Sequence, residues 1–262
     1  MRLGRLVNLW KLSRLRLRSE QDYRRFQACQ AALLTEYLEI NGVRVKGSRV
    51  LDLGSGIGGY SVELARQGAS VISLDLIKPS LEIPEGCTPL MASALAIPLR
   101  PATVDFVFCA SLIEHVPDPA ALLSEIKRTL VPGGYCYLSF PPFYSPLGGH
   151  EFAPFHYLGE RWALRLAGRR LRRQGWARDL YGVDPSPASF SEVYQASGLY
   201  KMTIARARRL IAASGLLSVD LSTRYLPLNP ARWPVVGEVL TWHVQFLLVK
   251  LIQQDLEGQS VK

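Results

Sequence analysis

The sequence predicts a doubly wound α/β fold with a mostly parallel sheet and an antiparallel last strand. Short runs rich in β-branched and aromatic residues alternate with helical periodicity over the first 140 residues, which is typical of parallel strands with helices on both faces. A glycine-rich stretch, VLDLGSGIGGY, joins the first such run to the helix behind it. The final apolar run follows its predecessor after a short Pro-containing segment, which favours antiparallel pairing over another crossover.

The elements of the first half can be assigned in order along the chain. A helix is expected at 21–40, because apolar residues recur there at helical spacing and Asn41-Gly42 would end it. The expected strands are 48–53, 69–76, 104–111 and 134–140. The helices between them are expected at 57–68, near 79–82 and at 118–130.

The alternation breaks after residue 140. Residues 141–200 are rich in Pro, Gly, aromatic residues and Arg, and they are too numerous for an ordinary connection. We expect a helix at about 159–174 within them, and we interpret the segment as a lid or substrate-binding insertion. A helix at 203–215 and strands at 216–225 and within 241–251 then complete the pattern.

Composition predicts a globular protein with two basic regions. The 262 residues, 48% of them hydrophobic, can form one large domain. We predict a basic N-terminal segment, 1–20, and a domain, 21–262, that carries the insertion. The net charge of +9 is concentrated in the first 25 residues, with eight Lys or Arg against two acids, and in 161–178, with seven Arg and no acid.

The basic N-terminal segment has two interpretations. A helix with an apolar stripe could lie on an anionic membrane surface, or it could dock on the rest of the chain. The stripe expected on such a helix consists of Leu3, Leu6, Val7, Trp10 and Leu17. Nucleic acid is disfavoured as a partner, because the basic regions lack interleaved aromatic residues and match no binding motif.

The cysteines indicate a reducing compartment. Cys29, Cys87, Cys109 and Cys136 stand far apart, with no CxxC pair and no His at ligand spacing, which argues against a zinc site or a disulfide framework. We therefore expect no metal and a cytoplasmic location, with any peripheral contact at the inner membrane surface. No apolar run is long enough for a signal sequence or for the roughly twenty residues of a membrane span.

The glycine-rich stretch fits two cofactor motifs. A turn from a strand directly into a helix is expected to direct backbone N–H groups into the crevice above the sheet. Gly54, Gly56 and Gly59 satisfy the dinucleotide pattern GxGxxG. Asp52 with Gly54, Gly56 and Gly58 instead gives DxGxGxG, which resembles motif I of class I S-adenosylmethionine-dependent methyltransferases.

A second segment favours the methyltransferase interpretation. VDFVFCASLIEHVPDPAALLSEIKRTLVPGGYCYLSFPP resembles the fourth strand, the following helix and the Pro-Gly-Gly turn before the fifth strand in the methyltransferase-11-like group. An antiparallel last strand also fits that group. The resemblance covers about residues 25–140 and 201–251 and implies a Rossmann-like fold, S-adenosyl-L-methionine as cofactor, and methyl transfer.

The resemblance also implies the cofactor-binding residues. Asp52 and the turn would hold the methionine part, and Asp75 would accept the ribose hydroxyls. Ser93 stands where the family usually has an Asp beside the adenine amino group, so weaker adenine discrimination is expected. The residues implied are Asp52, Gly54, Ser55, Gly56, Gly58, Asp75, Ser93, Ala94 and Ser111.

Catalysis requires alignment of the acceptor and, for a hydroxyl or a protonated amine, a base. His150 and His156 of the insertion are the first candidates, with His115 beside them; the alternatives are a hydrophobic mini-core with surface histidines and a turn-capping role for His115. The expected acceptor is a small molecule, glycolipid or natural-product-like compound, methylated at oxygen. An NAD(P)-dependent oxidoreductase and a cofactor-binding protein without catalysis are the alternative functions.

Overall fold

The computed structural model describes residues 3–16, 18–77, 86–171, 182–184, 186–194, 196–224 and 228–252. Its seven-stranded sheet has the order β3-β2-β1-β4-β5-β7-β6. The pairs β1–β2 and β2–β3 are parallel, whereas β6–β7 is antiparallel. The predicted α/β fold with an antiparallel last strand is therefore confirmed.

Two compact units divide the chain. The first comprises residues 1–108, 125–136 and 250–262, and the second comprises 109–124 and 137–249. Three elements contribute residues to both units: β4 (Val104–Ala110), α4 (Pro119–Thr129) and β5 (Leu130–Phe140). Each unit is described by itself below.

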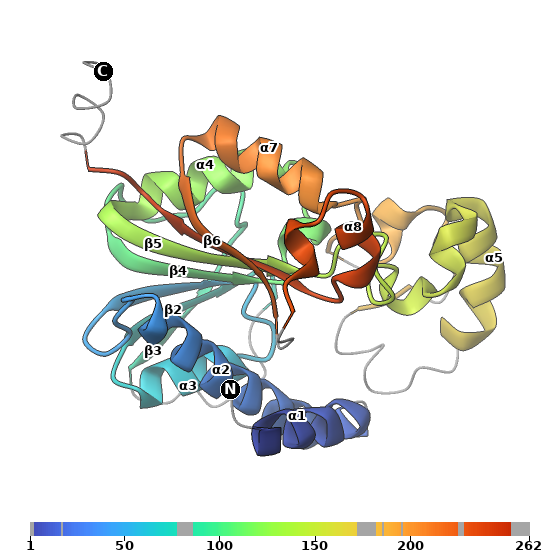
Figure 1. The fold of residues 1–262 in the computed structure, drawn as a ribbon, viewed down its shortest axis with the longest axis horizontal. Helices are drawn as coiled ribbons and strands as arrows, with labels where there is room; N and C mark the ends of the chain where they lie inside the picture. Colours follow the sequence, from blue (N-terminus) through green and yellow to red (C-terminus); the bar gives the residue numbers. More distant parts are fainter. Residues whose placement is uncertain are drawn as a thin grey trace. The chain divides into compact units, whose positions relative to one another are not determined.

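The first unit layers its helices outward from the strands (Figure 1). Its other elements are α1 (Leu3–Leu15), α2 (Glu20–Ile40), β1 (Arg49–Leu53), α3 (Gly59–Arg66), β2 (Ser70–Asp75) and β3 (Cys87–Met91). Helix α3 packs on β2 and β3, α2 packs on α3, and α1 packs on α2. Ser19 caps α2, since its hydroxyl accepts the N–H of Asp22. The helix predicted at 21–40 is confirmed.

The prediction of the apolar face of α1 is wrong where the structure describes it. Leu9, placed outside the stripe, is only 8% exposed, whereas Val7, placed inside it, is 46% exposed. The Asn8 side chain lies against the Cys29 sulfur, and the Arg16 guanidinium lies 5.8 Å from the centre of the Phe26 ring. Helix α1 is therefore docked on α2.

Strand β3 was not predicted from the sequence. It pairs with β2 in parallel, with Asp75 opposite Met91. Its sequence, CTPLM, includes a proline, and Met91 is 69% exposed. An exposed edge position tolerates a proline, which cannot donate a ladder hydrogen bond. The helix expected near 79–82 lies outside the described residues.

The Pro-Gly-Gly sequence lies inside β5, so the prediction of a turn before that strand is wrong. The strand begins at Leu130, four residues earlier than predicted. Gly133 has a φ of +77° and donates its N–H to the Lys250 carbonyl at 2.7 Å. A glycine is needed there because other residues rarely adopt this conformation.

The second unit contains the predicted insertion and the last strands. Its elements are η1 (Ile113–His115), η2 (His150–Phe152), η3 (Phe155–Leu158), α5 (Glu160–Leu171), η4 (Phe190–Glu192), α7 (Ile204–Ser214), β6 (Leu217–Thr223), η5 (Pro230–Arg232), α8 (Val236–Leu240) and β7 (Val244–Val249). The helix predicted at about 159–174 is confirmed as α5 up to Leu171, and residues 172–174 lie outside the described residues. The helix predicted at 203–215 is confirmed as α7. The strands predicted at 216–225 and within 241–251 are β6 and β7.

The insertion has a hydrophobic core of its own. This core is formed by Phe152, Ala163, Ala167, Val183, Phe190, Val193 and Leu199. Phe143 and Phe155 pack against it as partly buried residues. Several aromatic residues of the insertion therefore have a structural role, as the mini-core alternative predicts. Within the described parts of the chain, no helix has both the length and the apolar character needed to cross a bilayer.

Candidate functional site

The second unit brings two of the three predicted histidines together beside a buried glutamate. Glu114 and His115 lie in η1, and His150 begins η2. The Oε1 atom of Glu114 lies 3.9 Å from Nε2 of His115 and 3.8 Å from Nε2 of His150. The two imidazole rings meet edge to face, with centroids 4.9 Å apart. We call these three residues the Glu-His-His cluster.

Burial controls the charges of the Glu-His-His cluster. The Glu114 side chain is 2% exposed, and burial raises the pKa of its carboxyl to about 8. Burial also lowers the pKa of His115 to about 3 and that of His150 to about 4, and each has a neighbouring histidine that adds to the decrease. Both imidazoles are therefore neutral at neutral pH, when a ring nitrogen carries a lone pair.

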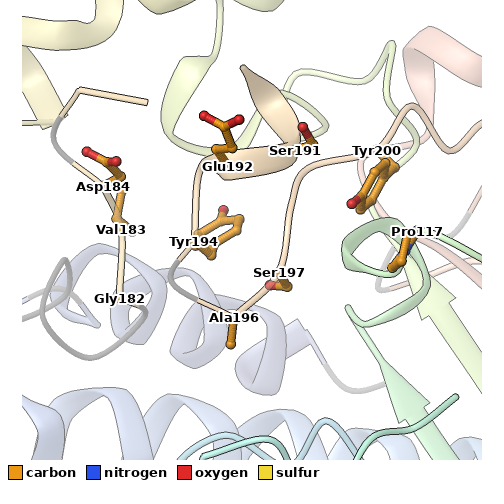
Figure 2. Close-up of a pocket in the computed structure, with 10 residues that line it drawn as sticks. All are labelled: Pro117, Gly182, Val183, Asp184, Ser191, Glu192, Tyr194, Ala196, Ser197 and Tyr200. Atoms are coloured by element: carbon orange, nitrogen blue, oxygen red, sulfur yellow. The ribbon is translucent and has the colours of Figure 1, made fainter. Parts of the chain in front are cut away.

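The cluster lies at the edge of a pocket. Tyr194 packs edge to face on the His115 ring, with centroids 5.0 Å apart, and also lines a pocket of about 900 Å³. Figure 2 shows the lining residues, nine from the segment 182–200 together with Pro117. Two of them are the carboxylates Asp184 and Glu192, and none of these ten described residues is Lys or Arg.

The third predicted histidine lies outside the cluster. His156 is 2% exposed, and burial lowers the pKa of its imidazole. Its ring lies 4.0 Å from the Tyr157 ring and 5.5 Å from that of Phe143, measured between centroids. The structure therefore places His156 among aromatic residues, and its catalytic role stays a prediction.

Ser111 follows β4 and has a left-handed backbone with a φ of +53°. Its N–H donates to the Ser139 carbonyl at 2.7 Å, and its Oγ lies 3.3 Å from Nε2 of His243. Burial holds the pKa of His243 well below its usual value. Sequence reasoning missed Tyr194 and His243 as members of this site, because their neighbours are distant in the chain, whereas it expected Glu114 to line the site after the fourth strand.

In the first unit, the glycine turn leads from β1 to α3. Gly54, Gly56 and Gly58 have φ values of +70°, +55° and +79°, which side chains rarely allow. Gly54 and Ser55 donate their N–H groups to the Leu74 carbonyl, and Gly58 donates to that of Ser55. For Gly54, Ser55 and Gly58, the expectation that N–H groups of the turn point into the crevice is wrong, because their internal pairing leaves them unavailable to a pyrophosphate. For the first residues of α3 it stays a prediction.

Asp75 ends β2 and closes the glycine turn. Its carboxylate accepts the N–H of Gly56 at 2.8 Å and that of Ile77 at 3.1 Å. An ionised carboxylate has about four acceptor positions, so two remain for hydroxyl groups of a ligand. The geometry is therefore compatible with the ribose-binding role that the family resemblance implies.

Asp52 lies beneath the turn and is 1% exposed. Its carboxylate accepts the Ser61 hydroxyl at 2.5 Å, and Ser61 contacts the Ser73 hydroxyl at 2.9 Å. Burial raises the pKa of Asp52 to about 7, although the Ser61 hydrogen bond opposes the increase. Direct contact between Asp52 and a ligand amino group stays a prediction.

Ser93 and Ala94 lie in the loop that follows β3. The Ser93 hydroxyl accepts the N–H of Leu95 at 3.2 Å, and Ala94 is buried. A hydroxyl with one accepted bond can still donate its proton and accept another. Ser93 therefore keeps one acceptor position for the adenine amino group.

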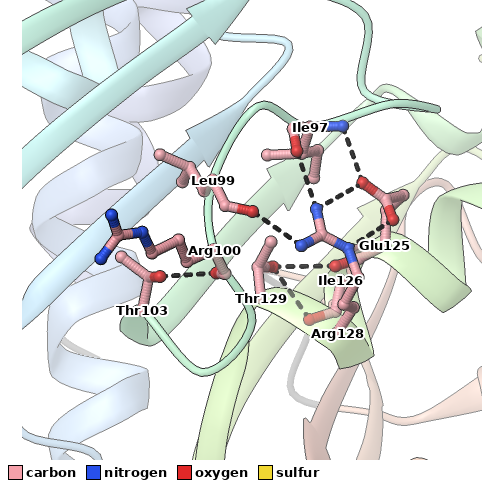
Figure 3. Close-up of polar contacts among 8 residues, drawn as sticks. All are labelled: Ile97, Leu99, Arg100, Thr103, Glu125, Ile126, Arg128 and Thr129. Atoms are coloured by element: carbon pink, nitrogen blue, oxygen red, sulfur yellow. Dashed lines mark hydrogen bonds and ion pairs between the residues drawn. The ribbon is translucent and has the colours of Figure 1, made fainter.

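Arg128 of α4 forms hydrogen bonds with residues 97–99, which follow Ser93 and Ala94 in this loop (Figure 3). Its guanidinium donates to the carbonyls of Leu99 and Ile97 at 2.6 and 2.7 Å and to Glu125 through Nε and Nη2. Glu125 also accepts the N–H of Ile97 at 2.7 Å. Paired charges with several hydrogen bonds hold a loop more strongly than a lone exposed ion pair.

Comparisons with known proteins identify the family. The sequence profile described as a methyltransferase domain matches residues 51–138. An uncharacterized methyltransferase of Mycobacterium ulcerans is 34% identical over 241 residues, covering 86% of each chain. An uncharacterized methyltransferase of Mycobacterium leprae is 32% identical over 179 residues, which are 65% of this chain. The match also spans 65% of that relative's length, slightly less than two thirds.

Solved structures agree at the level of the fold. An S-adenosylmethionine-dependent methyltransferase of Mesorhizobium loti has a TM-score of 0.53 at 20% identity, covering 78% of this chain and 92% of that one. One from Methanosarcina mazei has a TM-score of 0.50 at 19% identity, covering 82% and 98%.

The strand order and the glycine turn define an α/β protein of the class that binds a cofactor at the carboxyl ends of its strands. The chain belongs to the methyltransferases, and its fold is that of S-adenosylmethionine-dependent members. The resemblance seen in the sequence is confirmed, and the family replaces the oxidoreductase alternative.

Proposed function

We propose that this chain transfers the methyl group of S-adenosylmethionine to a hydroxyl oxygen of a small-molecule or lipid-linked acceptor. The observation that carries the proposal is the Glu-His-His cluster at the edge of the pocket in the second unit. Methyl transfer from a sulfonium is an in-line displacement, so the enzyme mainly aligns the reacting groups and excludes water. A hydroxyl acceptor must also lose a proton.

The donor would be held by the first unit. The turn at 54–58 with Asp75 supports this role, since four of its five backbone N–H groups, all but that of Ile57, donate to partners within the protein and Asp75 keeps free acceptor positions. A Cβ added at Gly56 would meet no protein atom within 4 Å. The space above Gly56 is therefore open to a ligand that approaches the backbone closely.

The acceptor hydroxyl would be activated at the Glu-His-His cluster. The Glu114 carboxyl, with its raised pKa, can exchange a proton near neutral pH, and the two neutral imidazoles beside it can accept or donate hydrogen bonds that position the hydroxyl. Among the described residues that line the pocket beside the cluster are two carboxylates and no cation. This lining suits an acceptor that is neutral or cationic near its reacting hydroxyl.

A lipid-linked acceptor is supported by an apolar surface of the second unit. Seven large apolar residues between 228 and 242 are each at least 48% exposed; they are Leu228, Trp233, Val235, Val236, Val239, Leu240 and Trp242. Tryptophans beside aliphatic side chains are typical of surfaces that lie in a membrane interface. The basic N-terminal segment is a second candidate for membrane contact, with Val7 and Arg14 exposed on α1.

Transfer of a labelled methyl group tests the proposed function. The full chain would be incubated with methyl-labelled S-adenosylmethionine and with separate lipid and aqueous fractions of a cell extract. We expect a labelled product with an alkali-stable ether methyl group, formed in one of the fractions by the wild type and lost with His150→Ala. Retained cofactor affinity in His150→Ala shows that the fold is intact. Equal turnover by the two proteins would reject the role of the cluster.

Flotation with anionic liposomes tests the membrane contact separately. We expect the wild type to float at low salt and the double variant Trp233→Ala, Trp242→Ala to remain at the bottom. Loss of flotation only in Arg14→Glu would transfer the contact to the basic N-terminal segment. No flotation of the wild type would remove membrane contact from the proposal.

A further inference from the structure

We propose that Glu114, His115 and His150 bind one divalent first-row metal ion, which activates the acceptor hydroxyl. The inference rests on the proposed function, because it specifies how the same cluster would act. Each residue offers one ligand atom, and the three atoms lie within 4.8 Å of one another. No spacing in the sequence indicates this site, since 35 residues separate His115 from His150.

Unpartnered buried atoms are the first independent support. Both carboxylate oxygens of Glu114 and Nε2 of His150 are buried without a hydrogen-bond partner. A buried carboxyl group without partners is costly, and it is usually compensated by a hydrogen bond, an opposite charge or a metal ion. A cation between Glu114 and His150 would satisfy all three atoms at once.

The orientation of His115 is the second support. Its Nδ1 lies 2.8 Å from the Gly198 carbonyl oxygen, which can only accept a hydrogen bond. The proton is therefore on Nδ1, and Nε2 presents its lone pair toward Glu114, 3.9 Å away. Metal-binding histidines generally donate their other ring N–H to a carbonyl or carboxylate, which fixes the tautomer and the ring orientation.

The backbone at His150 is the third support. His150 has a φ of +46°, an uncommon conformation for a residue with a side chain. Such conformations are strained and concentrate at functional sites. Here the conformation accompanies the position of His150 Nε2 only 3.8 Å from Glu114 Oε1.

Ligand chemistry indicates which metals fit. Two imidazoles and one carboxylate suit Zn²⁺, Mn²⁺, Fe²⁺ or Co²⁺, whereas Mg²⁺ and Ca²⁺ prefer oxygen ligands alone. Bonds of about 2.1 Å in tetrahedral geometry separate ligand atoms by about 3.4 Å. The two distances from Glu114, 3.8 and 3.9 Å, would contract by about 0.5 Å, and the imidazole ligand atoms, which lie within 4.8 Å of each other, would also move together. Three protein ligands leave a position open for the acceptor.

The ion would lower the pKa of a bound hydroxyl. The acceptor O–H bond breaks, and its proton leaves to solvent. The oxygen then forms the new bond to the methyl carbon as the bond from carbon to sulfur breaks, so that the sulfonium becomes a neutral thioether. No oxidant or reductant is needed.

Cobalt titration of the full chain tests the site directly. Chelator-treated wild type is expected to bind one Co²⁺ per chain with visible absorption typical of four or five ligands. Glu114→Gln and His150→Ala should each weaken Co²⁺ binding at least tenfold. His156→Ala removes an imidazole from the same segment outside the cluster, and it should retain the wild-type affinity for Co²⁺.

The proposal is overturned if the wild type binds no stoichiometric Co²⁺ or if Glu114→Gln and His150→Ala bind it as the wild type does. If either variant fails to fold, X-ray absorption on the Zn²⁺-loaded wild type decides: two imidazoles with oxygen ligands support the site, and an all-oxygen shell overturns it. If the protein binds Co²⁺ but transfers no methyl group, only the proposed function is rejected. If methyl transfer proceeds without metal but still requires His150, only the metal site is rejected.

Discussion

His115 donates its Nδ1 proton to the Gly198 carbonyl oxygen, 2.8 Å away and 83 residues later in the chain. The adjoining N–H of Tyr200 donates to the Glu114 carbonyl at 2.7 Å. These two bonds tie η1 to the segment that precedes α7, within the second unit. The first bond orients the His115 imidazole and the second holds the backbone of Glu114, which explains how the end of the insertion helps to build the site.

The tautomer of His115 is the first prediction. In the metal-free protein at neutral pH, the proton should be on Nδ1, because the Gly198 carbonyl can only accept. Long-range proton–nitrogen correlation spectra of the imidazoles would determine the tautomer. A proton on Nε2 of His115 would contradict the described orientation.

Arg128 should stabilise the loop that follows Ser93. Arg128→Ala removes charge-assisted hydrogen bonds to Glu125 and to the carbonyls of Ile97 and Leu99. We expect the free energy of unfolding to fall by about 2 kcal/mol, measured by urea denaturation. Arg66→Ala is the matched control, because its only described ion pair is exposed at 3.9 Å from Glu63, and it should change the value by no more than about 0.5 kcal/mol. Equal losses in both variants would reject the role of Arg128.

Asp52 should make stability depend on pH. The unfolded carboxyl ionises near pH 4, whereas the folded one keeps its proton until about pH 7 because burial raises its pKa. The folded state therefore binds more protons in this range, and its contribution to the free energy of unfolding falls by about 1.4 kcal/mol per pH unit as pH rises. Asp52→Asn lacks this contribution and can retain a hydrogen bond to Ser61.

Denaturation of the wild type and of Asp52→Asn between pH 4 and pH 8 measures the effect. As pH rises to about 7, the free energy of unfolding of the wild type should fall relative to that of Asp52→Asn, and above about pH 7 the difference should level off. The comparison cancels the contributions of the histidines, which both proteins share. A difference that does not change with pH would show that Asp52 is ionised throughout.

Ser93 offers a gain-of-affinity variant. Ser93→Asp restores the carboxylate that related methyltransferases place beside the adenine amino group, and it can still accept the N–H of Leu95. We expect tighter binding of S-adenosylmethionine in calorimetric titration, by about 1 kcal/mol for one added hydrogen bond. Weaker binding by the variant would show that the adenine does not lie at Ser93.

Local patterns in the sequence predicted most of the fold, because periodicity and turn residues report directly on helices and strands. The end of α2 at Asn41 and the helical period of α7 are examples. Strand β3 was missed because an exposed edge strand with Pro89 has neither alternation nor an unbroken ladder. The buried face of α1 was missed because packing against α2, and not the apolar stripe, determines that Leu9 is buried.

The site was predictable only in part for a similar reason. The glycine turn and Asp75 occupy recognisable positions at strand ends, so the sequence locates them. The pairing of the turn's N–H groups with Leu74 and Asp75 depends on tertiary structure. The meeting of His115, His150 and Glu114 depends on the path of the insertion, which has no periodic pattern from which it could be predicted.

The central claim is that the methyl donor lies along the glycine turn, and calorimetric titration of S-adenosylmethionine into Gly56→Ala tests it most directly. Gly42→Ala is the matched control, because both glycines have positive φ and neither would place a Cβ within 4 Å of another protein atom. Both variants should therefore lose similar stability, about 1 kcal/mol. We predict that Gly56→Ala binds the cofactor at least about tenfold more weakly than the wild type, while Gly42→Ala binds it unchanged. Wild-type affinity in Gly56→Ala would contradict the claim.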